Sequence, residues 1–279
     1  MKPKEVLYAL GFRPRPREYP YEIDTVTFPK EGALRFARWR HPNEDRMEFH
    51  QEEVDALRAF LHEGDVAIDI GAHSGDSALP MALAVGPRGA VLALEPNPYA
   101  FEVLAVNASL NPDRARIVPL MIAAMPEDGT FTFEYSDSGF CNGGLHRGIS
   151  PLKHHHFFKL NVEGRNLVRL TEREYADELR RVRYVKTDTE GFDRQVVASL
   201  RPLLDAQRPV LKCEVYRHLP ADERFGFHRD LRAAGYRVFK WESPAVFRGE
   251  ELTESRMTAW PHFDLVAFPS EARISSSGS

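Results

Sequence analysis

The feature that most constrains the fold is a regular alternation of short apolar runs with helix-like segments, which begins at Val66 and continues to residue 269. The runs at 66–70 (VAIDI), 90–96 (AVLALEP) and 184–188 (YVKTD) are typical of buried strands. Strands that alternate with helices form a mostly parallel α/β sheet with helices on both faces. Ligands of such sheets bind beyond the carboxyl ends of the strands, so the site is expected in the segments that follow them.

The same alternation divides the chain of 279 residues into parts. We predict an N-terminal extension at 1–47, one α/β domain at 48–270 and a flexible tail at 271–279. Two short strands are expected in the extension, which we expect to contact the substrate or a partner subunit. Residues 136–170 show no clear period and are interpreted as a loop. Within it, 138–144 (SGFCNGG) predict either a lid over the cofactor or a plain turn.

A glycine-rich turn, DIGAHSGD at 69–76, follows the first buried strand and opens a helix. Glycines let a backbone approach a ligand closely, and the first N–H groups of a helix bind carboxylates or phosphates. Glu95 ends the next strand, where a carboxylate can accept hydrogen bonds from both hydroxyls of a ribose. A nucleotide cofactor is therefore expected here, either NAD or S-adenosylmethionine.

The spacing within the turn favours S-adenosylmethionine. Dinucleotide-binding turns carry GxGxxG, whereas this turn has no second glycine two residues after Gly71, and it has Asp69 two residues before that glycine. An acidic side chain that points into the turn is a poor neighbour for a pyrophosphate. It suits a cofactor that carries a positive amino group and a sulfonium. An NAD-dependent oxidoreductase is the alternative.

A second acidic motif, KTDTEGF at 186–192, follows a later strand. Because side chains alternate along a strand, Asp188 and Glu190 are expected to face the same way at the ligand edge. Methylation of an alcohol requires removal of its proton, and these carboxylates or His218 are the candidate bases. N-methylation on the same fold is an alternative, although the (Asn/Asp)-Pro-Pro-aromatic motif of nucleobase methyltransferases is missing from the sequence. Asp188 has the alternative roles of capping the next helix or pairing with Lys186.

Three carboxylates at the expected strand ends, Asp188, Glu190 and Glu214, are candidate ligands for a divalent metal ion. Their spacing alone does not separate a metal site from a hydrogen-bonded cluster of acids. A run of histidines at 154–156 is a second unusual group, but neighbouring residues of a regular element point in different directions. We interpret this run as a solvated loop or an edge that faces the substrate, with a metal site as the alternative.

Three motifs occur in order along the chain, at 66–76 (VAIDIGAHSGD), 92–98 (LALEPNP) and 184–197 (YVKTDTEGFDRQVV). Together they resemble the FkbM-type methyltransferases, a branch of the class I S-adenosylmethionine-dependent fold. The resemblance covers roughly residues 50–215. It implies a Rossmann-like seven-stranded sheet with an antiparallel last strand. It also implies an O-methyltransferase that acts on a hydroxyl of a small molecule, a sugar or a natural-product scaffold.

The resemblance also assigns roles to residues. The glycine-rich turn would hold the cofactor, Glu95 would hold its ribose, and the second acidic motif would lie by the reacting atoms. Contacts with the cofactor are expected from Asp69, Gly71, Ala72, His73, Gly75, Glu95, Pro96, Asn97, Ala123, Ala124 and Asp188. The two alanines of this set would flank the adenine. His73 departs from the family pattern, which usually has asparagine there, but an imidazole can still donate to the cofactor's carboxylate.

Composition limits the partners. Lys and Arg total 37 and Asp and Glu total 41, a formal net charge of −4, which argues against nucleic acid and against a polybasic membrane anchor. No run approaches the roughly 18 apolar residues of a membrane helix, and we find no signal peptide. The two cysteines, Cys141 and Cys213, are scattered in the sequence and do not make a disulfide framework or a CxxC metal site. We therefore expect a cytoplasmic enzyme with a neutral hydroxyl acceptor, working alone or as a homo-oligomer.

Overall fold

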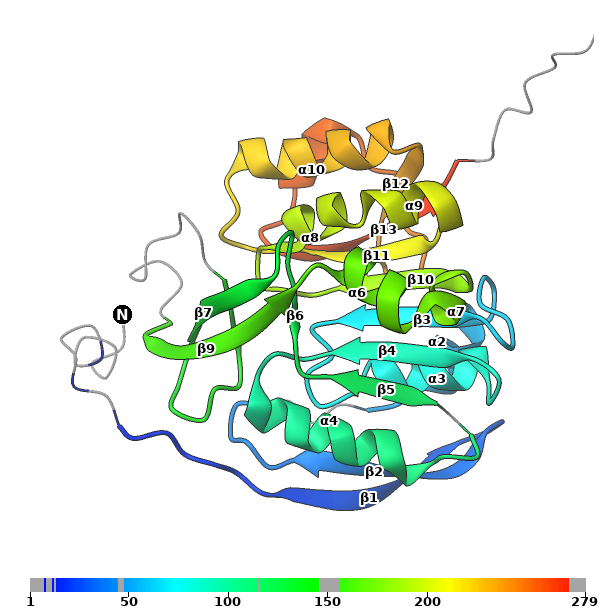
Figure 1. The fold of residues 1–279 in the computed structure, drawn as a ribbon. Helices are drawn as coiled ribbons and strands as arrows, with labels where there is room; N and C mark the ends of the chain where they lie inside the picture. Colours follow the sequence, from blue (N-terminus) through cyan, green and yellow to red (C-terminus); the bar gives the residue numbers. More distant parts are fainter. Residues whose placement is uncertain are drawn as a thin grey trace, which may run out of the picture.

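The computed structural model describes residues 8, 12, 14–44, 48–114, 116–145 and 156–270. Its central element is a seven-stranded sheet with the order β12-β13-β11-β10-β3-β4-β5 (Figure 1). The strands are β3 (Val66–Ile70), β4 (Ala90–Leu94), β5 (Ile117–Leu120), β10 (Val182–Thr187), β11 (Val210–Val215), β12 (Tyr236–Lys240) and β13 (Phe263–Pro269). β13 is antiparallel to both of its neighbours, whereas β5, β4, β3, β10 and β11 pair in parallel. The predicted Rossmann-like sheet with an antiparallel last strand is confirmed.

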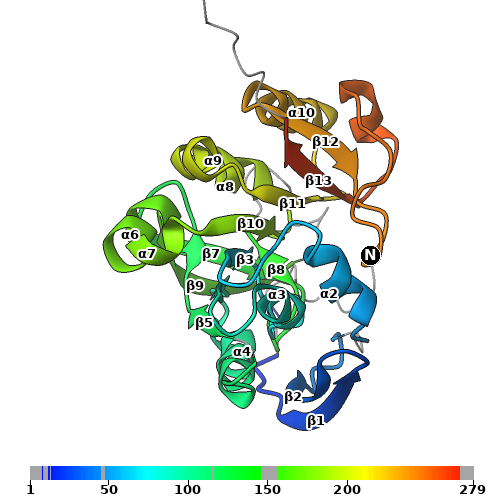
Figure 2. The same cartoon turned by 90° about the vertical axis from the view of Figure 1, so that its right-hand side faces the viewer.

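Helices cover both faces of this sheet (Figure 2). They are α2 (Gln51–Leu57), α3 (Ala78–Val85), α4 (Pro98–Leu110), α6 (Leu167–Glu174), α7 (Ala176–Leu179), α8 (Asp193–Ser199), α9 (Arg201–Gln207), α10 (Ala221–Ala233) and the 3-10 helix η1 (Glu254–Thr258). Because strand side chains alternate, Val66 and Ile68 of β3 belong to the buried cluster on the face of α6, α8, α9 and α10, while Ala67 belongs to the cluster with α2 and α3 on the other face. The alternating burial explains why apolar residues fill the whole of β3 and β4.

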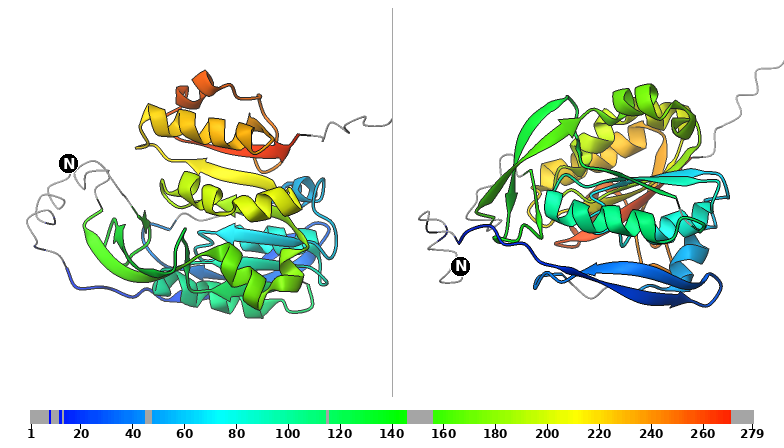
Figure 3. Two further views of the ribbon diagram at one scale, coloured as in Figure 1. Left: turned by 45° about the horizontal axis from the view of Figure 1, so that its top comes forward. Right: turned by 60° about the horizontal axis from the view of Figure 1, so that its bottom comes forward.

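A two-stranded hairpin precedes the central sheet, as predicted for the extension. β1 (Tyr21–Phe28) and β2 (Gly32–Trp39) pair antiparallel and form a layer outside α4 (Figure 3). Ala37 and Trp39 pack against α4 residues in one buried cluster. The Asn107 side chain fastens the layer, since it accepts from the Ala37 N–H at 2.6 Å and donates to the Ala37 carbonyl at 2.9 Å. The hairpin thus packs on its own domain.

A second sheet lies beyond the carboxyl ends of β3 and β4 (Figure 1). It contains β6 (Ala123–Ala124), β9 (Phe158–Arg165), β7 (Gly129–Tyr135) and β8 (Gly143–Gly144), in that order. The interpretation of 136–170 as a loop is therefore wrong for β9 and for the start of α6. β9 reads FKLNVEGR, and its alternation of apolar and polar residues is the strand signal that was missed.

Some predictions fall on parts of the chain outside the described residues. These are the tail at 271–279 and His154 and His155, whereas His156 is described and buried. Within the described residues, no helix is both long enough and apolar enough to cross a membrane. The predicted boundaries of the extension and the main domain stay predictions.

Candidate functional site

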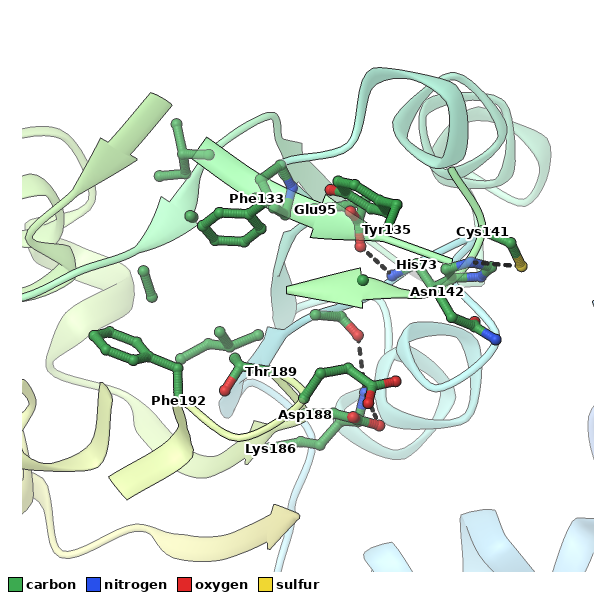
Figure 4. Close-up of a pocket in the computed structure, with 18 of the residues that line it drawn as sticks. His73, Glu95, Phe133, Tyr135, Cys141, Asn142, Lys186, Asp188, Thr189 and Phe192 are labelled. Atoms are coloured by element: carbon green, nitrogen blue, oxygen red, sulfur yellow. Dashed lines mark hydrogen bonds and ion pairs between the residues drawn. The ribbon is translucent and has the colours of Figure 1, made fainter. Parts of the chain in front are cut away.

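A cavity of about 390 Å³ lies where β3, β4 and β10 end, between the central sheet and the second sheet (Figure 4). This is the edge at which the parallel topology predicts a ligand. Eight of the predicted site residues line the cavity: Gly71, His73, Glu95, Pro96, Ala123, Ala124, Asp188 and Glu190. The structure therefore brings together the glycine-rich turn, Glu95 at the end of β4 and the acidic motif at 186–192.

The turn after β3 is shaped by backbone conformations that few residues adopt. Gly71 has a φ of 76°, and a Cβ atom placed on it would lie 2.0 Å from the carbonyl oxygen of Asp188. His73 has a φ of 48°, in the left-handed region where Asn and His are enriched. Because asparagine and histidine both tolerate this conformation, either residue can occupy position 73. Ala72 is fully buried, and Gly75 lies against Leu104 of α4. These two residues of the turn therefore pack in the interior and do not line the cavity.

Asp69 lies beneath the turn, fully buried, rather than at the cavity wall. Its Oδ1 is 3.2 Å from the Lys186 Nζ, and its Oδ2 accepts a hydrogen bond from the Ser77 hydroxyl at 2.6 Å. Lys186 also donates to the Gly71 carbonyl at 3.0 Å and lies 3.7 Å from Asp188 (Figure 4). The positive partner of Asp69 is thus a lysine of the chain itself, and the predicted pairing of Asp188 with Lys186 is observed.

Burial opposes the charge of Lys186, but the nearby carboxylates of Asp69, Asp188 and Asp76 raise its pKa above the usual range. The ammonium group therefore stays protonated. It joins the base of the glycine-rich turn to the end of β10, so that Asp69 and Asp188 share one positive partner.

Glu95 is buried at the end of β4 and is held by backbone donors. Its Oε2 accepts from the His73 N–H and its Oε1 from the Asn97 N–H, both at 2.9 Å. Burial raises the pKa of this carboxyl group, although both hydrogen bonds act against that rise. Each oxygen keeps a further lone pair for a hydroxyl donor. Asn97 itself caps α4 through Tyr99 and is buried beside the cavity.

Apolar residues form one end of the cavity. Ala123 and Ala124 on β6 line it together with Phe133 of β7 and Phe192, which Figure 4 shows on the side away from His73. Figure 4 shows His73 and Asn142 on the other side, and Asp76 and Lys186 also line the cavity. The cavity wall therefore combines an apolar side with polar and charged groups.

Glu190 and Asp193, which follow β10, and Glu214 of β11 form a buried acidic cluster. Burial, Asp188 and Asp193 raise the pKa of Glu190 to about 7. Burial and the nearby Asp188 likewise raise the pKa of Asp193 to about 7. The pKa of Glu214 is raised well above its usual range by burial and its acidic neighbours. Glu190 lines the cavity and is the member of this cluster with a pKa near neutrality that a substrate can reach.

Two predicted residues lie away from the cavity. Glu214 is buried in β11, 3.6 Å from the His262 Nδ1. His218 packs its ring against Tyr216 at 5.2 Å. Among the three acids proposed as metal ligands, burial and Asp188 raise the pKa of Glu190 and of Glu214, but the three acids do not meet at ligand distance. Within the described part of the chain, the one set of three potential ligands within 4.8 Å of one another is Glu44, His73 and Cys141.

The segment predicted as a lid or a plain turn is a hydrogen-bonded turn between β7 and β8. Asp137 accepts from the Gly139 N–H at 2.7 Å and from the His41 Nε2 at 3.0 Å. Asn97 donates to the Phe140 carbonyl, and Tyr99 stacks on the Phe140 ring at 5.3 Å. Cys141 then lines the cavity.

Sequence reasoning missed several residues of the cavity wall. They are Asn43, Glu44, Asp76, Phe133, Tyr135, Cys141, Asn142 and Lys186. Lys186 had a usable signal, since a lysine within an otherwise apolar strand needs a buried partner. Cys141 and Asn142 belong to the segment 138–144 predicted as a lid or a plain turn, but no pattern singled out these two residues. Asn43, Glu44, Phe133 and Tyr135 reach the cavity through long-range packing, which no local motif indicates.

Comparisons with known proteins bear on this site. The model of the methyltransferase FkbM domain family matches residues 69–238. A search of curated proteins found no match. Among solved structures, a methyltransferase FkbM from Methylobacillus flagellatus KT is 14% identical over 75% of this chain and 44% of its own, with a TM-score of 0.46. The chain therefore spans less than half the length of that protein.

Two further solved structures are similar at the same level. A SAM-dependent O-methyltransferase from Thermotoga maritima is 14% identical, with 91% of this chain and 79% of its own covered and a TM-score of 0.45. Fibrillarin from Aeropyrum pernix, in complex with S-adenosyl-L-methionine, is 11% identical, with 91% and 96% covered and a TM-score of 0.40.

Proposed function

The chain belongs to the methyltransferase FkbM domain family and is a methyltransferase, and on that premise we propose that its cavity binds S-adenosylmethionine and serves O-methylation. The observation that carries the proposal is Glu95. Two backbone N–H groups fix its carboxylate at the end of β4, beside the Gly71 turn, with lone pairs free for two hydroxyls.

Other residues of the cavity wall also suit S-adenosylmethionine. Ala123, Ala124 and Phe192 offer the apolar slot that an adenine ring needs. Gly71, which no larger residue can replace without meeting Asp188, lets the chain pass close to the ligand. His73, Asp76 and Asn142 also line the cavity and offer polar contacts for the charged groups of the methionine moiety. S-adenosylmethionine supplies an electrophilic methyl group on its sulfonium.

Glu190 is proposed as the general base. A base works best when its pKa lies near the operating pH, and the pKa of Glu190 is raised to about 7. It accepts the proton of an acceptor hydroxyl as the oxygen becomes nucleophilic. Asp188 lies beside it, half exposed and paired with Lys186, and helps to position the acceptor. His218 has no part in this proposal, because its ring packs on Tyr216 instead.

The acceptor is proposed to be a neutral hydroxyl compound, such as a small molecule, a sugar or a natural-product scaffold. Asn43 and Asn142 at the cavity wall offer amide groups that suit a hydroxylated ligand. The net charge of −4 gives little attraction for nucleic acid. A cytoplasmic location is proposed with it, since the two buried cysteines are both free.

The experiment is methyl transfer from S-adenosylmethionine carrying a labelled methyl group, with matched panels of alcohols, sugars and amines. The proposal predicts a labelled methyl ether and no labelled amine. Glu190→Gln should lower turnover by about 10²-fold or more, the usual effect of losing a general base. The exposed Glu102→Gln is the matched control and should not change it. Label that appears on nitrogen, or full turnover in Glu190→Gln, would refute O-methylation through this base.

A further inference from the structure

We propose that Glu44, His73 and Cys141 form a zinc site in the wall of the cavity. The three side chains come from segments far apart in the sequence: Glu44 follows the β1–β2 hairpin, His73 belongs to the turn after β3, and Cys141 precedes β8. All three line the cavity. The site is distinct from the acids after β10, and the inference stands independently of methyl transfer.

The distances suit ligation of one ion after small side-chain movements. One potential ligand atom from each of the three residues lies within 4.8 Å of the other two, and the Cys141 Sγ is 3.8 Å from the Glu44 Oε2. His73 binds an ion through one ring nitrogen only: its Nε2 lies 3.9 Å from the Cys141 Sγ, and its Nδ1 lies 3.4 Å from the Glu44 Oε2. In a tetrahedral zinc site, with Zn–S of about 2.3 Å and Zn–N of about 2.0 Å, ligand atoms are about 3.3–3.6 Å apart. The three donor atoms therefore need to approach one another by at most about 1.5 Å.

The kinds of donor select the metal. A thiolate and an imidazole are preferred by zinc, whereas magnesium and calcium take oxygen ligands. Three protein ligands leave a fourth position for water. Glu44, His73 and Cys141 are the one set of three such donors that lie within 4.8 Å of each other in the described parts of the chain.

Surrounding contacts already hold the ligands in place. The Ser74 hydroxyl donates to the Glu44 Oε1 at 3.3 Å. The His73 backbone is fixed by its N–H bond to Glu95, and its ring contacts Trp39 at 5.5 Å. Cys141 is buried in an apolar cluster with Trp39 and residues of α4. Such outer contacts orient metal ligands and lower the cost of assembling them.

A neighbouring histidine is not available as a fourth ligand. The His41 Nδ1 accepts from the Asn43 N–H at 3.0 Å, and its Nε2 is bonded to Asp137 at 3.0 Å. Both ring nitrogens are therefore engaged. This fixes the expected ligand set at one sulfur, one nitrogen and one carboxylate oxygen, and the ion would join three segments of the chain.

The test is a titration of the full chain, stripped of metal and kept reduced, with Co²⁺ as a spectroscopic substitute for zinc. We expect one equivalent of Co²⁺ to give a thiolate-to-cobalt charge-transfer band that one equivalent of Zn²⁺ abolishes. Cys141→Ser should remove the band, whereas Cys213→Ala should keep it, since that thiol is buried in β11. No band in the wild type, or a band that survives Cys141→Ser, would overturn the proposal.

Two further variants keep the test decisive if Cys141→Ser folds poorly. His73→Asn preserves tolerance of the left-handed backbone, and Glu44→Gln preserves shape while removing charge. Each should weaken Zn²⁺ binding, measured by competition with a chromophoric chelator, by more than about 100-fold, beyond the usual effect of an outer-shell change. Unchanged affinity in both would mean that the three residues form a hydrogen-bonded trio only.

Discussion

Removing the charge of Lys186 should leave Asp69 buried without a positive partner. In the folded chain the Lys186 Nζ is 3.2 Å from the Asp69 Oδ1 and donates to the Gly71 carbonyl at 3.0 Å. Lys186→Met keeps most of the apolar stem and removes the ammonium group. The fully buried carboxylate then retains the Ser77 hydroxyl as its remaining donor among the described contacts.

The expected cost follows from the asymmetry of buried ion pairs. Removal of one partner typically costs about 3–5 kcal/mol, because the other charge stays buried and uncompensated. For a domain of this size that corresponds to a drop in Tm of about 6–20 °C. Asp69→Asn should cost less, about 1.5–3 kcal/mol, because Lys186 keeps Asp188 at 3.7 Å and the carbonyl of Gly71.

Urea unfolding of the two single variants and the double variant measures the coupling directly. The double variant should be more stable than the sum of the single losses predicts, by about 1–3 kcal/mol. Lys212→Met in the next strand is the matched control, because its pair with Asp264 at 2.9 Å is partly exposed, and it should cost less than about 1 kcal/mol. Losses below that level for Lys186→Met, or additive losses, would refute the buried pair as the base of the turn.

Further predictions concern the turn, the hairpin and the acidic cluster. Gly71→Ala places a Cβ atom 2.0 Å from the Asp188 carbonyl oxygen. The variant should be less stable by about 1–3 kcal/mol or more in urea unfolding, and it should bind the cofactor more weakly. A variant with unchanged stability and affinity would exclude the tight turn. Asn107→Ala deprives Ala37 of two buried bonds and should cost about 2–4 kcal/mol by the same assay. The pKa of Asp193 is raised to about 7 in the folded chain, from about 3.9 in the unfolded chain, so between these values the folded state binds one proton more. The free energy of unfolding should therefore fall as the pH rises from about 4 to about 7. Asp193→Asn should flatten this dependence on pH. Turnover should rise with pH through about 7 because Glu190 must lose its proton to act as a base, and a profile unchanged in Glu190→Gln would remove it from the reaction.

The parts of the site that follow local rules were predictable from the sequence. Gly71 and Glu95 were found because a glycine turn and an acid at the next strand end depend only on nearby spacing. The antiparallel last strand, in contrast, came from the family resemblance. β9 was missed even though FKLNVEGR alternates, since the long irregular stretch before it hid the pattern.

Other features depend on partners that are distant in sequence. Asp69 was expected to face the cofactor, but Lys186 from β10 neutralises it, and only the pairing of β3 with β10 brings the two together. Glu214 ends the expected strand, yet its side chain lies in the buried layer beside His262. Glu44 enters the cavity because the hairpin packs on α4, and no motif in the extension signals that packing.

Whether this cavity binds S-adenosylmethionine can be measured by calorimetry with S-adenosylhomocysteine. We expect saturable binding with one site, and a loss of about 10–150-fold in affinity for Glu95→Gln, the equivalent of about 1.5–3 kcal/mol for hydrogen bonds to a charged group. The exposed Glu102→Gln on α4 should bind like the wild type. No binding by the wild type, or equal affinity of wild type and Glu95→Gln, would show that the cavity is not an S-adenosylmethionine site.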